Sequence, residues 1–115
     1  MDATAALAEL VALSTQVVEV VTTTPDGAVE AARTASDARA GALAAAGREL
    51  LAAAGAVRPG DHAVERVHVD LEGGSLVICS DGERSIVATT VAEPTAGLVA
   101  YDLRVALRRM RGEAA

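Results

Sequence analysis

Lysine, phenylalanine and tryptophan are missing from this chain of 115 residues, and tyrosine occurs once, at Tyr101. All ten basic residues are arginines, a usage associated with high-GC bacterial genomes. With one aromatic side chain, the protein lacks the series of stacking platforms on which single-stranded nucleic acid binds. The core has to be built from Ala, Val and Leu within a composition that is 51% hydrophobic. We therefore expect helices and sheet to approach one another closely.

Positive charge is scarce as well, because the formal net charge is −6 at pH 7. Affinity for phosphate backbones needs clustered basic side chains, so this balance argues against a nucleic-acid partner. The one cysteine, Cys79, excludes an intramolecular disulfide and a multi-cysteine zinc site. We expect it to be a small core residue, since it lies inside a strand-like run. His62 and His68 have no carboxylate or cysteine at ligand spacing, so we expect no metal and no cofactor.

No apolar run approaches the roughly 20 residues of a membrane-spanning helix, so we expect no membrane insertion. The first ten residues lack the basic segment of a signal peptide, and we expect a cytoplasmic protein. A phosphate-binding loop of the P-loop type needs a lysine, which this chain lacks. Residues 80–82, Ser-Asp-Gly, lack the Gly-x-Ser-x-Gly pattern of a hydrolase nucleophile. We expect no catalytic residues and no enzymatic activity.

The clearest local pattern is a set of three β-branched runs, residues 63–71, 75–80 and 85–91, separated by Gly-containing turns. Such spacing predicts a three-stranded antiparallel meander. In the first run apolar residues, among them Val67 and Val69, alternate with polar ones, which is typical of an edge strand. The middle run is apolar on both faces and needs cover on both sides. The sequence therefore predicts a sheet between two helix layers.

The remaining segments supply those layers and two more strands. Helical spacing predicts a first helix over residues 4–14, with Asp2 or Thr4 as N-cap. Two strands, 16–23 and 28–33, flank a type I turn at residues 24–27. A long helix runs from Thr34 or Ser36 to Ala56, and a last helix follows Thr95 as N-cap. We expect one domain over residues 1–112 and a frayed tail at 113–115.

The long helix has two unlike faces. Its larger apolar residues form a stripe that should lie on the sheet: Leu43, Leu50, Leu51, Ala54 and Val57. The opposite face carries almost no charge and consists of Ala38, Gly41, Ala45, Ala52 and Ala56. One interpretation is that Ala is simply a strong helix former. The other is that Gly41 and Ala45, four residues apart, let a second helix come close, so that this face is a partner surface.

The last helix places its apolar residues on one face, namely Val99, Leu103, Ala106, Leu107 and Met110. Four arginines gather towards its C-terminal end: Arg104, Arg108, Arg109 and Arg111. A solvated basic face that suits the helix dipole explains them. A docking patch for an acidic partner is the alternative.

The order and spacing of four segments resemble the Roadblock/dynein-light-chain family, in its bacterial MglB-like branch. They are Asp26-Gly27, the Ala-rich helix 35–56, the run LEGGSLVI at 71–78, and GLVAYDL at 97–103. Together they cover nearly the whole chain. The family often has Pro-Gly-Val before the first strand, where this chain has LSTQV at 13–17.

The resemblance implies an α+β fold, a three-layer α/β/α sandwich with a five-stranded antiparallel sheet (Roadblock/profilin-like). The long helix would cover one face of the sheet and the two terminal helices the other. Members of the family usually dimerise by pairing the strand at 63–71 with its copy and laying the long helices side by side. The implied homodimer interface comprises Ala38, Gly41, Ala45, Ala52, Val67 and Val69.

The function that the resemblance implies is that of a non-catalytic homodimeric adaptor or regulator of a small Ras-like GTPase. Whether it would activate, inhibit or tether the GTPase stays open. Paired long helices would form a platform flanked by Arg39, Arg48 and Glu49, the expected partner-binding residues. The alternative is a profilin-like or PAS-like small-molecule sensor domain. A sensor needs a cavity with convergent polar groups, and Ala-rich packing offers little to recognise a ligand.

Overall fold

The structure, a computed structural model, describes residues 1–57, 60 and 63–113. Within these residues the elements follow the predicted order, helix, two strands, helix, three strands, helix. Their bounds are α1 Ala3–Leu13, β1 Val17–Thr23, β2 Val29–Arg33, α2 Asp37–Gly55, β3 Arg66–Leu71, β4 Gly74–Ser80, β5 Ser85–Thr90 and α3 Ala96–Met110.

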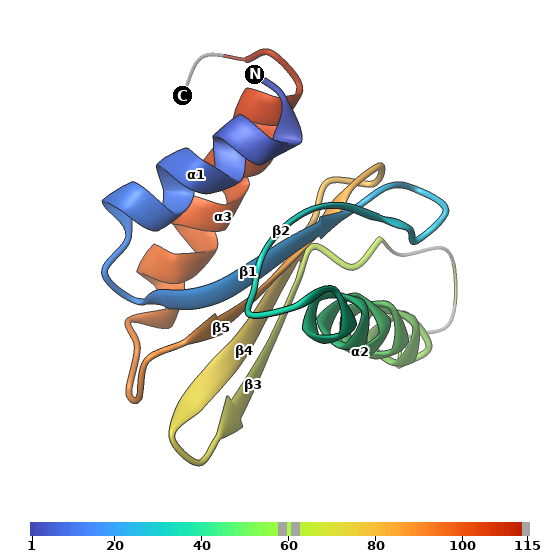
Figure 1. The fold of residues 1–115 in the computed structure, drawn as a ribbon. Coiled ribbons are helices and arrows are strands. Elements are labelled where there is room, and N and C mark those ends of the chain that lie inside the picture. The colour runs from blue at the N-terminus through green and yellow to red at the C-terminus, as the bar shows by residue number, and fades with distance from the viewer. Residues whose placement is uncertain (58–59, 61–62, 114–115) are drawn as a thin grey trace.

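The five strands form one antiparallel sheet in the order β2-β1-β5-β4-β3. Figure 1 shows α2 on one side of this sheet and α1 with α3 on the other. The predicted three-layer sandwich is thereby confirmed. The predicted edge position of β3 is confirmed too, and β2 forms the other edge.

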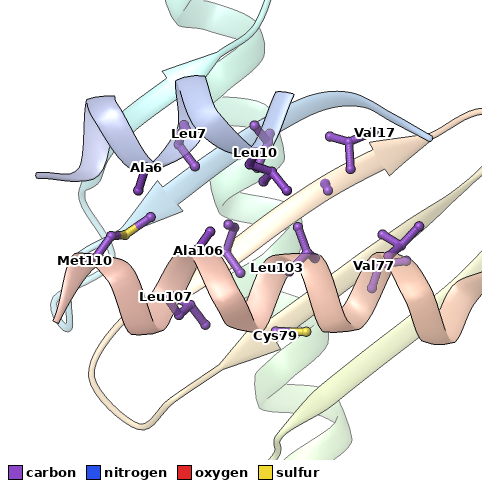
Figure 2. Packing of buried hydrophobic residues seen from close by; sticks show 14 of the residues in the cluster. Ala6, Leu7, Leu10, Val17, Val77, Cys79, Leu103, Ala106, Leu107 and Met110 are labelled. Carbon is purple, nitrogen blue, oxygen red and sulfur yellow. The ribbon is translucent and has the colours of Figure 1, made fainter. Parts of the chain in front are cut away.

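The core consists of two layers separated by the sheet. Figure 2 shows the layer between the sheet and the terminal helices, where Leu7, Leu103 and Leu107 meet Val77 and Cys79. The layer beneath α2 is smaller and comprises Val21, Ala40, Leu43, Leu76, Ile78 and Val87. Alternate residues of β4 therefore enter opposite layers, which confirms that this strand is covered on both faces.

Side-chain hydrogen bonds cap the N-termini of α1 and α2 but not that of α3. The Asp2 carboxylate accepts a hydrogen bond from the amide of Ala5 at 2.7 Å, and the Ser36 hydroxyl accepts one from the amide of Arg39 at 3.1 Å. Thr95 holds the N-cap position of α3, but its side chain makes no capping hydrogen bond. Its amide instead donates to the side chain of Gln16 at 2.6 Å.

The turn between β1 and β2 has the predicted geometry. The amide of Gly27 donates to the carbonyl of Thr24 at 2.9 Å. Gly27 has a φ of 87°, a left-handed conformation that a residue without a Cβ adopts most easily. The turn returns the chain as β2, which pairs with β1 with a shift of register at residues 22–23.

One residue assigned to the sheet-facing stripe of α2 lies elsewhere. Val57 is 78% exposed, because the helix ends at Gly55 and the chain turns away. Leu50 and Leu51 are half-buried and do pack against the smaller core layer. The predicted tail begins at residue 113, and this residue still contacts α3. The amide of Glu113 donates to the carbonyl of Arg108 at 3.0 Å.

Some sequence predictions fall outside the described residues. They concern the histidine at position 62 and the last two residues of the tail. None of the helices traced in the described ranges combines the length and the apolar character needed to cross a bilayer.

Candidate interaction surface

The outer side of α2 carries only small side chains along much of its length. Ala38, Gly41 and Ala52 are exposed and Ala45 is half-buried. A Cβ atom built on Gly41 would have no heavy atom within 4 Å. We call these four residues the small-residue face. It has no large apolar side chain and offers another backbone a close approach.

The inner side of α2 is held against the sheet by a glycine that sequence reasoning missed. A Cβ atom on Gly47 would stand 2.4 Å from Cγ2 of Val87, closer than such atoms come in folded proteins. The helix can therefore lie this close to β5 only with glycine at position 47. The sequence does contain a pattern that places Gly47 on this side of the helix. Gly47 follows Leu43 by four residues and so belongs to the sheet-facing stripe.

The open edge of the sheet lies beside this helix. β3 pairs with β4 alone, in a register that sets Val67 opposite Ile78 and Val69 opposite Leu76. Val67 and Val69 are half-buried and pack against the core layer under α2. What β3 can offer a second chain is therefore its backbone, whose outer amide and carbonyl groups meet no other strand of the described chain.

Arg39, expected to bind a partner, is engaged within the chain. Its Nε lies 2.9 Å from Oε2 of Glu19 and its Nη2 lies 3.0 Å from Oε1, a two-pronged pair between α2 and β1. Hydrogen bonding from Arg39 lowers the pKa of the Glu19 carboxyl against the opposing effect of burial, and the Thr89 hydroxyl at 3.2 Å adds to the lowering. The same pairing raises the pKa of Arg39.

Arg48 lies in the second half of α2, next to the turn between β1 and β2. Its Nη1 would be 3.3 Å, and its Cδ 3.5 Å, from a Cβ atom built on Gly27. Both residues line an open hollow that also includes Asp26 and, from the turn between β4 and β5, Glu83. Arg48 thus joins the small-residue face to two hairpin turns at one end of the molecule. Glu49 beside it is exposed.

Two further ion pairs link distant parts of the chain. Arg84 Nε lies 2.8 Å from Glu30 Oε2, which ties the start of β5 to β2. Arg109 Nε lies 2.6 Å from Glu9 Oε1, which ties α3 to α1. No spacing rule could have paired residues so far apart in the sequence.

In the part of the chain that the structure describes, no three His, Cys, Asp or Glu side chains are placed to hold a metal ion. His68 Nε2 lies 3.0 Å from Asp70 Oδ1 on β3. Cys79 is fully buried beneath α3, and burial raises the pKa of its thiol.

No protein-family model matches the sequence, and no curated protein is similar to it. Solved structures are similar in three dimensions. A Roadblock/LC7 domain from Streptomyces avermitilis matches 97% of this chain with 97% of its own length, at a TM-score of 0.84 and 20% sequence identity. This chain has the Roadblock/LC7 fold. The resemblance that the sequence motifs predicted is confirmed at the level of the fold.

Two MglB structures share the Roadblock/LC7 fold with this chain. The gliding protein MglB of Thermus thermophilus matches 97% of the chain with 90% of its own, at a TM-score of 0.75 and 18% identity. A structure described as MglB with tetrameric arrangement matches 94% with 84% of its own, at a TM-score of 0.70 and 17% identity.

Proposed function

We propose that this protein is a non-catalytic, homodimeric adaptor or regulator of a small Ras-like GTPase in the bacterial cytoplasm. The observation that carries the proposal is the exposed small-residue face of α2, which lies next to the open edge of β3 in a Roadblock/LC7 fold. Most helices that face water carry more charge than this one does.

Dimerisation would use both features at once. Two copies of α2 with Gly41 and Ala45 at the contact can approach closely, because interaxial distance depends on the side chains between helices. β3 would add main-chain hydrogen bonds by pairing with its copy, while Val67 and Val69 keep their contacts with the core. MglB in its tetrameric arrangement is a protein of the same fold in which several copies assemble.

The GTPase would bind across the paired helices near the hairpin turns. Arg48 is the stronger anchor of the two flanking arginines, because Arg39 is already held by Glu19. Arginine is enriched among the few residues that dominate binding energy at protein interfaces. Glu49 would supply a charge of opposite sign at the rim. Two copies offer a broader platform than one, and stable interfaces need about 800 Å² from each partner.

The sensor alternative receives less support. The hollows in the described regions of the chain are open to solvent and lie at its surface, whereas a ligand sensor encloses most of its ligand.

Two measurements test the proposal. Light scattering during size exclusion at tens of micromolar should give twice the chain mass of 11.6 kDa. Calorimetry should then detect binding of a Ras-like GTPase from the same organism, titrated in its GDP form and with a GTP analogue. A monomeric mass would contradict the dimer. Absence of binding in both nucleotide states would contradict the GTPase partner.

A further inference from the structure

The arginines of this acidic protein fall into two groups. Arg39, Arg84, Arg109 and Arg111 each lie within 4 Å of a carboxylate oxygen. Within residues 1–57, 60 and 63–113, five others do not, and these are Arg33, Arg48, Arg66, Arg104 and Arg108. The last three line two adjoining hollows, and the proposed function assigns no role to their side chains.

Register and packing bring Arg66 and Arg104 together. Arg66 on β3 is directly opposite Cys79 on β4, and side chains of opposed residues lie on the same face of a sheet. Cys79 lies under α3, with its sulfur 3.8 Å from the carbonyl oxygen of Ala100. Arg104 follows Ala100 by one helical turn. Both arginines act on the Cys79 thiol, whose pKa they pull down against the effect of burial.

The surface around these arginines is concave. Arg66 and Arg104 line one open hollow together with the segment 63–65, which leads into β3. Arg104 and Arg108 line an adjoining hollow of about 890 Å³. On α3, Tyr101, Arg104 and Arg108 are spaced by three and four residues and so lie along one face. Tyr101 is 53% exposed.

We propose that Arg66, Arg104 and Arg108, with Tyr101 beside them, form a docking groove for an acidic peptide segment of a partner protein. Guanidinium groups bind carboxylates with two parallel hydrogen bonds, which a peptide rich in Glu or Asp can satisfy repeatedly. The tyrosine ring offers an apolar contact between those charges. The carboxylate of Glu65 lies on the same rim. It would repel an acidic residue of the peptide at that point and so restrict how the peptide is placed in the groove.

An acidic peptide fits this groove better than the other polyanions do. A membrane surface meets cations that project from a flat or convex face, whereas these arginines border hollows. Affinity for nucleic acid grows with the number of phosphates that cations neutralise, and three arginines are few for that purpose. The larger hollow reaches α2 at Leu51, Ala52 and Gly55, so its α2 wall borders the small-residue face. The arginines that would bind the peptide lie on β3 and α3, and they are not the expected GTPase-binding residues Arg48 and Glu49.

The test uses the whole chain and a fluorescein-labelled peptide in which Glu alternates with Val, followed by fluorescence anisotropy. We expect saturable binding that weakens as salt is added. Arg104→Glu should reduce affinity by about tenfold or more, because it replaces an attraction with a repulsion. The milder Arg104→Gln should reduce it by a smaller factor. Arg33→Glu makes the same charge change on β2, at the opposite edge of the sheet, and should leave affinity within about twofold.

Several outcomes would overturn the proposal. They are no saturable binding of the peptide, equal loss in the Arg33→Glu and Arg104→Glu proteins, and retention of binding in Arg104→Gln and Arg104→Glu proteins that circular dichroism shows to be folded. Binding to phosphatidylserine vesicles or to single-stranded DNA without binding to the peptide would replace the acidic peptide by another class of partner.

Discussion

Gly47 of α2 lies so close to Val87 of β5 that a Cβ atom on the glycine would stand 2.4 Å from Cγ2 of the valine. Glycine in a helix interior costs about 1 kcal/mol relative to alanine. This chain, which uses alanine freely, retains glycine where the helix touches the sheet. The contact sets how far α2 stands from β5, and therefore where its small-residue face lies relative to the edge strand β3.

Gly47→Ala should destabilise the protein in spite of the better helix former. Overpacking a filled core costs about 1–3 kcal/mol, and the gain in helix propensity returns about 1 kcal/mol. We expect a net loss of about 1 kcal/mol, and at most about 2 kcal/mol, in the free energy of unfolding measured by urea denaturation. Val87 is 1% exposed and has little space into which to move.

The control for this prediction is Gly97→Ala in the first turn of α3. A Cβ atom there would meet no heavy atom within 4 Å, so the variant should be as stable as the parent or slightly more stable. If both alanine variants are equally stable, the close contact does not constrain α2.

Acid should weaken the link between α2 and β1. The pKa of Glu19 is lowered below 4.5, first by hydrogen bonding from Arg39. A carboxyl whose folded pKa is lowered contributes stability above its unfolded pKa and loses it as pH falls through the folded value. The parent should therefore lose more free energy of unfolding between about pH 5 and pH 3 than Glu19→Gln does.

Urea titrations at several pH values measure this difference. Glu49→Gln is the matched control, because it removes an exposed carboxylate that makes no ion pair with the described residues. Its pH dependence should follow that of the parent. Identical curves for parent and Glu19→Gln would show that the pair contributes nothing to acid sensitivity.

Local patterns predicted most of this fold. The alternation in β3 located an edge strand, and the doubly apolar run of β4 required helices on both faces. The turn at residues 24–27 was recognised from a proline and a glycine, each with a defined backbone preference. In all three cases residues that are neighbours in sequence determine the structure.

The misses concern contacts that form only when distant segments meet. The sequence predicts that Arg39 is free to bind a partner protein. Its ion-pair partner Glu19 lies 20 positions earlier, and no local pattern links the two residues. Arg84 and Glu30 are 54 positions apart. The sequence predicts Val57 on the sheet because the helical pattern continues beyond the point where α2 ends. The sequence placed the small-residue face on the side of α2 away from the sheet, and its residues are exposed or half-buried there. That a second copy of the chain binds this face stays a prediction.

Gly41→Arg and Ala45→Arg should each prevent dimerisation. A long charged side chain at either position would hold two copies of α2 apart and would be buried between them without a partner. Light scattering should show the mass of one chain. The melting temperature should fall below that of the parent, because association no longer stabilises the folded chain. The new side chain of Gly41→Arg would not clash within its own chain, since Gly41 has open space around it.

Glu49→Arg introduces the same side chain on the flank of the helix and should keep most of the dimer. If the Gly41 and Ala45 variants retain the mass and melting temperature of the parent, the small-residue face reflects only the helix propensity of alanine.

Arg48→Glu should weaken binding of the GTPase by about tenfold or more while the dimer keeps its mass. Arg48 lies where α2 meets the β1–β2 turn, and a reversed charge there would repel whatever acidic group it now attracts. Arg39→Glu should affect folding stability more than binding, because it breaks the pair with Glu19.

The control for the GTPase site lies on the other side of the sheet. Reversal of Arg108 and Arg109 should leave GTPase affinity within about twofold, because α3 covers the other face of the sheet from α2 and Arg109 is bound to Glu9. Calorimetry on all three proteins in both nucleotide states makes the comparison. Loss of binding only in the Arg108 and Arg109 variant would move the GTPase from α2 to α3, and the acidic-peptide groove would then be its binding site.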